Sequence, residues 1–209
     1  PDVPGAGLIV DCTACQIRHP GEPFIDAMTF YSGKHKMYAL KKEVCVNVRS
    51  GTAALVSKAY PGSVHDITIL RGHAQVLRQV LGERALLADL GYRGGERDVP
   101  TMVVCGRNDE ARQRRVLVEC YFGRLKCLWT MFSRKWVLSH ERFDTFFDVA
   151  CALTNLDVLV RPLQRRDAEF NRGLLNIILM ERQRKAERQR IANETYLRNR
   201  RDAMEEARD

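Results

Sequence analysis

The sequence predicts an α/β fold in which helices flank one mixed β-sheet and a long helical extension follows at the C-terminal end. One reason is the order of the predicted elements: strand, strand, strand, helix, strand, short strand, helix. A helix in that position connects two strands that lie parallel and side by side. Another is the composition, which becomes almost wholly polar some way beyond Arg161 and Pro162. A chain of 209 residues, 45% of them hydrophobic, is long enough to bury one sizeable core.

The sequence of the N-terminal third of the chain predicts three strands. Residues 7–17 form an apolar run that begins at a glycine and carries Asp11. Residues 36–48 and 53–60 read as two further strands around a tight Ser-Gly turn, and a Pro-Gly pair ends the second one. These two strands are expected to form an antiparallel hairpin that extends the first strand.

The next segment supplies the crossover. Residues 63–81 predict a helix, although a central glycine weakens it. Residues 84–95 predict a buried strand that ends at Asp89 and a glycine-rich turn, and residues 101–105 predict one more short strand. Since the crossover helix makes the strands before and after it parallel, Asp11 and Asp89 are expected on adjacent strands.

A helix over residues 109–129 has one apolar face, and Glu119 lies on the border of that face. Arg115 lies one turn before Glu119 and Lys126 two turns after it, on nearly the same line. The simpler interpretation is a surface ion pair between Arg115 and Glu119, worth a few tenths of a kcal/mol. The alternative is that Glu119 reaches over the sheet edge.

Three carboxylates, Asp11, Asp89 and Glu119, then converge from distant parts of the sequence. Hard oxygen ligands of this kind favour Mg²⁺ or Mn²⁺ over zinc. Two such ions can stabilise the attacking and leaving oxygens of an in-line phosphoryl transfer, without a covalent nucleophile on the protein.

The C-terminal part divides the chain into two predicted regions, 1–163 and 164–209. Residues 140–160 read as a helix that is apolar on most sides and therefore buried. Residues 174–180 are apolar and open a segment of mixed charge without Pro or Gly, which predicts a long exposed helix.

The charge and the cysteines narrow the function classes. A net charge of +8 favours a polyanionic partner, nucleic acid before membrane, and no apolar run is long enough to span a bilayer. Seven cysteines, several inside apolar runs, are typical of a reducing compartment rather than of a disulfide framework. Cys12 and Cys15 have the spacing of zinc ligands, but no second pair matches them.

Several segments carry a resemblance to a known family. They are "IVDCT" at 9–13, "YSGKHKMYALKKEVCVNVRSG" at 31–51, "AYPGSVHDITIL" at 59–70, "LLADLGYRG" at 86–94, "RVLVECYFGRLK" at 115–126 and "ACALTNL" at 150–156. In this order they resemble the Harbinger group of DDE transposases, over about residues 8–160. The resemblance implies an RNase H-like fold with Asp11, Asp89 and Glu119 as the catalytic metal triad.

Glu119, with Arg115 and Lys126, is also similar to the Arg–Glu–Lys signature of bacterial insertion-sequence transposases, where Arg112 replaces the usual Tyr. Two features depart from the Harbinger pattern. Cys12 replaces the glycine that usually follows the first aspartate, and the interval of 30 residues between Asp89 and Glu119 is short.

Asp66 competes with Asp89 for the second place in the triad. Ser63 and Asp66 have the spacing of a capping-box variant at the start of a helix, which gives Asp66 a structural role. Asp66 and His65 are therefore retained as accessory candidates only.

Cations around the site are candidates for DNA contacts. Lysines with interleaved tyrosines stud the first hairpin, a pattern that suits the tracking of phosphates but is also typical of a solvated strand face. The candidates are Lys34, Lys36, Arg93, Arg112, Arg115 and Lys126.

The resemblance favours a metal-dependent enzyme that cleaves DNA strands and transfers them. A domesticated, catalytically silent transposase that acts as a DNA- or chromatin-associated protein is the alternative, and an RNase H-like nuclease for RNA or branched DNA is a third. The resemblance further implies a Myb-like DNA-binding partner, a homo-oligomer such as a dimer, and a nuclear location.

Overall fold

A computed structural model describes residues 6–20, 24–105 and 109–206. Its strands belong to one mixed sheet, in which β2, β3, β1, β6 and β7 are neighbours in that order and β4 and β5 both pair with β3. β1 runs antiparallel to β3 and parallel to β6, which is parallel to β7. The strands are β1 (Ala6–Gln16), β2 (Tyr31–Ser32), β3 (Met37–Asn47), β4 (Ala53–Val56), β5 (Tyr60–Pro61), β6 (Ala85–Ala88) and β7 (Met102–Val104).

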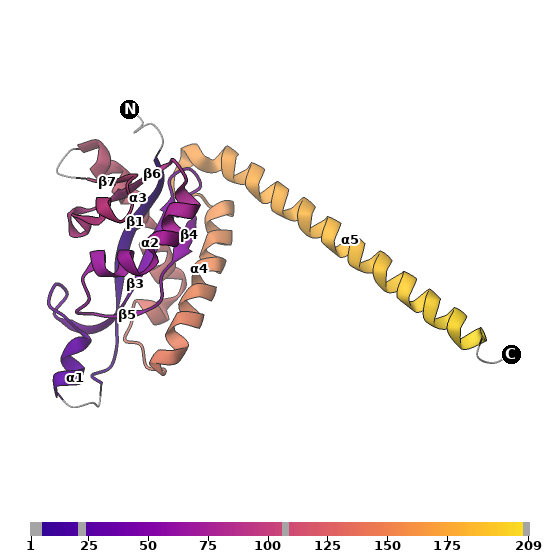
Figure 1. Cartoon of the computed structure of the whole chain (residues 1–209), viewed down its shortest axis with the longest axis horizontal. Coiled ribbons are helices and arrows are strands. Elements are labelled where there is room, and N and C mark those ends of the chain that lie inside the picture. Colours follow the sequence, from indigo (N-terminus) through magenta and orange to yellow (C-terminus); the bar gives the residue numbers. More distant parts are fainter. Residues whose placement is uncertain (1–5, 21–23, 106–108, 207–209) are drawn as a thin grey trace.

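Helices cover both faces of this sheet (Figure 1). Successive side chains of a strand point to opposite faces. On β1, Val10 therefore packs in the cluster formed with α2, whereas Ile9 packs in the cluster formed with α3 and α4. The predicted RNase H-like α/β class is confirmed. The helices are α1 (Phe24–Thr29), α2 (Asp66–Leu81), α3 (Asp109–Leu128), α4 (Phe143–Val160) and α5 (Ala168–Glu206).

Three predicted elements differ from the observed ones by more than one residue at a boundary. The strand predicted over 53–60 is interrupted after Val56, where the Ala59 N–H turns away and donates to Asp144 Oδ1 at 2.7 Å. The helix predicted over 63–81 begins at Asp66, and it is kinked at His73, next to the glycine expected to weaken it. The helix predicted over 140–160 begins with a short 3-10 turn before α4.

The expected burial of α4 is wrong for one of its faces. Phe143 and Phe147 lie in the core, but Phe146, Val149 and Leu153 are exposed. Apolar residues on all sides of a helix predict that each side is covered, but they do not show which part of the molecule covers it. The described part of this chain leaves that face of α4 uncovered.

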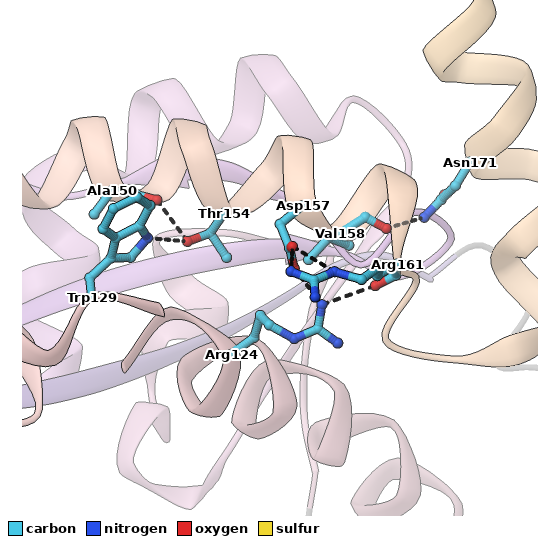
Figure 2. A network of polar contacts seen from close by, with 8 residues as sticks. All are labelled: Arg124, Trp129, Ala150, Thr154, Asp157, Val158, Arg161 and Asn171. Carbon is cyan, nitrogen blue, oxygen red and sulfur yellow. Dashed lines mark hydrogen bonds and ion pairs between the residues drawn. The ribbon is translucent and has the colours of Figure 1, made fainter. Parts of the chain in front are cut away.

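The long exposed C-terminal helix is confirmed. Asn171, at the start of α5, donates to the carbonyl oxygen of Ser50 at 3.0 Å. It also donates to the carbonyl oxygen of Val158 at 3.2 Å (Figure 2). Beyond this anchor α5 leaves the core as one extended helix (Figure 1). The division into 1–163 and 164–209 stays a prediction. In the part of the chain that the structure describes, no helix has the length and apolarity to cross a membrane.

Candidate active site

Asp11 lies on β1 and is largely buried. Its Oδ1 accepts a hydrogen bond of 2.8 Å from the backbone N–H of Cys12. Burial raises the pKa of Asp11 to about 6, and the charge of Asp89 adds to the rise, while the Cys12 N–H and the charges of Arg115 and Lys34 oppose it. A negative charge at this position is costly, so a cation beside it is favourable.

Asp89 follows the last residue of β6 and caps the 3-10 turn that comes next, where its Oδ1 accepts a hydrogen bond of 2.7 Å from the Gly91 N–H. β6 is parallel to β1, with Leu87 opposite Ile9. Asp89 and Asp11 each stand two residues beyond this pair. Asp11 therefore lies within β1 and Asp89 directly after β6, on neighbouring strands as predicted, and the two carboxylates stand at the same level across the sheet.

Glu119 comes from α3, whose buried residues Val118 and Leu125 fix the helix against the sheet. The Glu119 side chain is 60% exposed, consistent with its predicted place on the border of the apolar face. Arg115, one turn earlier, points toward the sheet edge and is 26% exposed.

One nitrogen of Arg115 lies within 4.0 Å of all three carboxylates. Its Nη2 lies 3.5 Å from Asp89 Oδ2, 4.0 Å from Asp11 Oδ2 and 3.9 Å from Glu119 Oε1. The Arg115–Glu119 contact is therefore more than the surface ion pair of the simpler interpretation. The three acidic residues, far apart in the sequence, surround a single positive charge.

This set of donors fits Mg²⁺ or Mn²⁺ in its chemistry, since carboxylate oxygens are the ligands that these ions prefer. As the side chains stand, no three His, Cys, Asp or Glu residues within 6–20, 24–105 and 109–206 are arranged to hold one metal ion. The carboxylates are instead spaced around the guanidinium of Arg115. Their role as metal ligands stays a prediction.

Asp66 has a different surrounding from Asp89, and the expected capping box is wrong. His65, not Ser63, is the N-cap residue of α2, and no side chain caps the helix there. Ser63 Oγ instead donates to the Thr29 carbonyl oxygen at 2.6 Å. Asp66 forms a largely buried ion pair with Lys41. The His65 side chain is exposed.

Asp66 nevertheless lies close to the Asp89 turn. A Cβ placed on Gly91 would lie 3.0 Å from Asp89 Oδ1 and 3.3 Å from Asp66 Oδ2. The two aspartates thus flank the same glycine. Lys41 compensates Asp66, whereas Arg115 lies against Asp89.

Of the cations predicted to contact DNA, some are exposed near the carboxylates and one forms a bond within the protein. Lys34 and Lys36 are exposed in the turn before β3, and the charge of Lys34 reaches Asp11. Arg93 is exposed just after the Asp89 turn. Lys126 Nζ donates to the carbonyl oxygen of Ala14 at 3.0 Å, so it ties α3 to β1. Arg112 belongs to α3, but its side chain lies outside the described part of the structure.

Two lysines of the first hairpin do not form a free phosphate-tracking surface. Lys42 is 1% exposed, and its Nζ donates to Asp144 Oδ1 at 2.6 Å and Asp148 Oδ1 at 3.0 Å. Lys41 pairs with Asp66. A strand alternation cannot reveal these partners, because they come from helices α4 and α2.

A buried polar cluster behind the carboxylates was not predicted. Tyr92 OH lies 3.3 Å from Cys12 Sγ and so connects the Asp89 turn with the residue after Asp11. Nearby, Glu43 Oε1 lies 2.7 Å from His73 Nε2. Burial raises the pKa of Glu43, while contacts with His73 and Tyr92 oppose the rise. The one sequence feature that pointed to this cluster is Tyr92 itself, an aromatic residue with a hydroxyl group three positions after Asp89.

The cysteines form no disulfide among the described residues, and all seven are free. Cys15 belongs to the core cluster on the α3 and α4 side of the sheet, whereas Cys12 packs against the cluster on the α2 side. Because their side chains lie on opposite faces, this pair cannot share a zinc ion. Cys12 fills the expected glycine position by contacting Tyr92.

Residues 10–155, more than half of the chain, match the family model described as DDE superfamily endonuclease. No curated protein matches the chain. The matched segment includes the three carboxylates and Arg115, and it ends within α4.

Proposed function

The chain belongs to the DDE superfamily endonucleases, and on this premise we propose that it is the catalytic domain of a Harbinger-type transposase or of a nuclease derived from one. The proposed reaction is cleavage of DNA strands and their transfer by two-metal phosphoryl transfer. The observation that carries the proposal is the convergence of Asp11, Asp89 and Glu119 around one nitrogen of Arg115.

Asp11, Asp89 and Glu119 would hold Mg²⁺ or Mn²⁺. A bound ion of this kind supplies Lewis-acid stabilisation of phosphate oxygens and a water or DNA 3′-hydroxyl activated for attack. The backbone N–H groups of Cys12 and Gly91 each fix one oxygen of an aspartate, which leaves the other oxygen facing Arg115. This arrangement orients both aspartates before any ligand arrives.

Arg115 has two proposed roles. In the structure described it neutralises part of the charge of the three carboxylates. If the carboxylates held a metal cation, the guanidinium would be free to donate to a phosphate oxygen of the DNA strand, a contact for which Arg is well suited.

DNA is the proposed partner, and its backbone would follow the exposed cations beside the carboxylates. Lys34, Lys36 and Arg93 are exposed. The charge of Lys34 acts on Asp11, Lys36 lies two residues further along the same turn, and Arg93 ends the turn that Asp89 caps. We further propose a nuclear location, a separate Myb-like protein that selects the DNA sequence, and a homodimer that holds paired DNA ends.

The alternative function is a catalytically silent, domesticated transposase that binds DNA or chromatin. One observation is compatible with this alternative: the guanidinium of Arg115 already offsets part of the charge of the three carboxylates without a metal ion. The two functions differ in whether the folded protein binds a divalent cation.

Calorimetric titration of Mn²⁺ into the wild-type chain and into four variants separates the two. We expect Asp11→Ala, Asp89→Ala and Glu119→Ala to lose binding and Asp66→Ala to keep it, with circular dichroism as the check on folding. A matching loss of Mn²⁺-dependent DNA cleavage should accompany the first three. A folded wild-type chain that binds no Mn²⁺ even with DNA present would favour the silent protein.

A further inference from the structure

α4 exposes a continuous apolar stripe on the face that points away from the core. The stripe consists of large side chains that are between 42% and 65% exposed. Consecutive members are three or four residues apart, the spacing of the a and d positions in a coiled-coil seam. The members of this α4 stripe are Phe146, Val149, Leu153, Leu156 and Val160.

A stripe of this kind is suited to another helix. Large exposed apolar patches mark interaction sites in soluble proteins, and the alternating spacing matches the knobs-into-holes packing of a helical partner. α5 of the same chain does not cover the stripe, because these side chains are exposed beside α5, which runs away from the core (Figure 1). Val137 and Leu138, also exposed, lie just before the 3-10 turn that leads into α4.

The two ends of α4 carry opposite charge. In its N-terminal half one cation, Lys42, serves two carboxylates, Asp144 and Asp148. Glu141 and Arg142, directly before the helix, offset each other, so the net charge at this end is negative.

At the C-terminal end one carboxylate, Asp157, serves two cations, Arg124 and Arg161, which leaves a net positive charge (Figure 2). Arg165 and Arg166 follow and are exposed. An antiparallel pair of α4 helices therefore places each acidic half beside a basic end.

We propose that a second copy of this chain covers the stripe, with the two α4 helices packed antiparallel around a two-fold axis. Such an interface is self-complementary, because the same surface serves both partners. Two copies of a chain with net charge +8 repel each other. The stripe itself contains no charged residue, and the charges at its ends attract in this orientation. The proposal names the surface of the homodimer proposed above, but it does not depend on catalysis.

Sedimentation velocity of the whole chain over a range of concentrations tests the proposal. We expect a dimer for the wild type and a monomer for Val149→Glu, whose dissociation constant should rise about 100-fold or more, because each dimer buries the new charge twice. Val76→Glu is the matched control, since Val76 is 46% exposed on α2, outside the stripe. It should remain a dimer.

Two control measurements, of folding and of Mn²⁺ binding, separate a loss of the dimer from a loss of the fold or of the metal site. Circular dichroism should show the same helix content for both variants, and Val149→Glu should bind Mn²⁺ as the wild type does. A wild-type chain that stays monomeric at every concentration overturns the proposal and leaves the stripe to a different protein. A Val149→Glu chain that remains dimeric also overturns it, since another surface then holds the copies together.

Cross-linking tests the orientation after the exposed Cys120 and Cys127 are replaced by serine. In the antiparallel register that layers Leu153 against Leu156, a cysteine at 156 lies near its symmetry mate, whereas two cysteines at 146 are roughly 25 Å apart along the helices. A short bismaleimide should therefore join two Leu156→Cys chains and fail to join two Phe146→Cys chains. Equal cross-linking of both variants indicates parallel helices and refutes the antiparallel pair.

Discussion

Replacing Arg115 with alanine should tighten Mn²⁺ binding, although the change removes a residue from the centre of the candidate site. The Nη2 atom of Arg115 lies 3.5 Å from the nearest oxygen of Asp89, 3.9 Å from Glu119 and 4.0 Å from Asp11. A divalent cation has to compete with this guanidinium for the same oxygens. Without Arg115, the carboxylates have no competing cation.

The size of the effect follows from charges about 4 Å apart. At an effective dielectric constant of about 20, two unit charges at that distance interact by about 4 kcal/mol. Arg115 is 26% exposed and Glu119 is 60% exposed, so solvent screens much of this energy. A net effect of about 1–2 kcal/mol remains, which corresponds to roughly a tenfold lower dissociation constant for Mn²⁺.

Calorimetry at pH 8 is the appropriate assay, because the loss of Arg115 raises the pKa of Asp11 further and protons would compete with Mn²⁺ at lower pH. Arg71→Ala is the matched control, since Arg71 pairs with Asp98 at 2.9 Å away from the carboxylates. It should leave the affinity unchanged. Equal or weaker Mn²⁺ binding by a folded Arg115→Ala chain refutes the competition and makes Arg115 a support that holds the carboxylates in place.

Asp11→Asn should abolish Mn²⁺ binding yet stabilise the fold by about 3 kcal/mol above pH 6, since folding raises the pKa of Asp11 from 3.8 to about 6. The gain should fade as the pH falls from 6 to 4, where wild-type Asp11 is protonated, and urea unfolding at pH 8 and pH 4 measures it. Tyr92→Phe should lower the free energy of unfolding by about 1 kcal/mol through the lost Cys12 contact, measured by the same unfolding experiment. Lys34→Ala should reduce the salt dependence of DNA binding by about one phosphate contact, whereas Lys42→Met should leave it unchanged. Equal slopes for the last two variants would contradict the assignment of Lys34 to DNA.

The strands and helices that position the site follow from local patterns. β6 is an apolar run that ends directly before Asp89, and β1 begins with an apolar run that reaches Asp11 in the middle of the strand. α3 has an apolar face wide enough to predict its side toward the sheet. β5 and α1 are too short to leave a pattern. They depend instead on tertiary contact: a Cβ on Gly62, just after β5, would lie 2.5 Å from the carbonyl oxygen of Phe30, just after α1.

Residue pairing was harder to predict than element position. Ser63 and Asp66 have the spacing of a capping box, but Lys41 of β3 pairs with Asp66 instead. The capping box fails because α2 begins at Asp66, so that Asp66 is the first residue of the helix and not the third. The partners of Lys42 could not be predicted either. The alternation of polar and apolar residues along β3 does not show that α4 supplies two carboxylates to Lys42.

The two cations that flank Glu119 on α3 have different functions. Arg115 lies among the three carboxylates and offsets part of their negative charge. Lys126 donates to the Ala14 carbonyl oxygen on β1, three residues beyond Asp11. This bond fixes the distance between the helix that carries Glu119 and the strand that carries Asp11. A shift of α3 along the sheet would move Glu119 and Arg115 together away from the two aspartates. The helix thus needs one cation to balance the carboxylates and another to hold them in register, which explains why a carboxylate on the edge of a buried face lies between two positive charges.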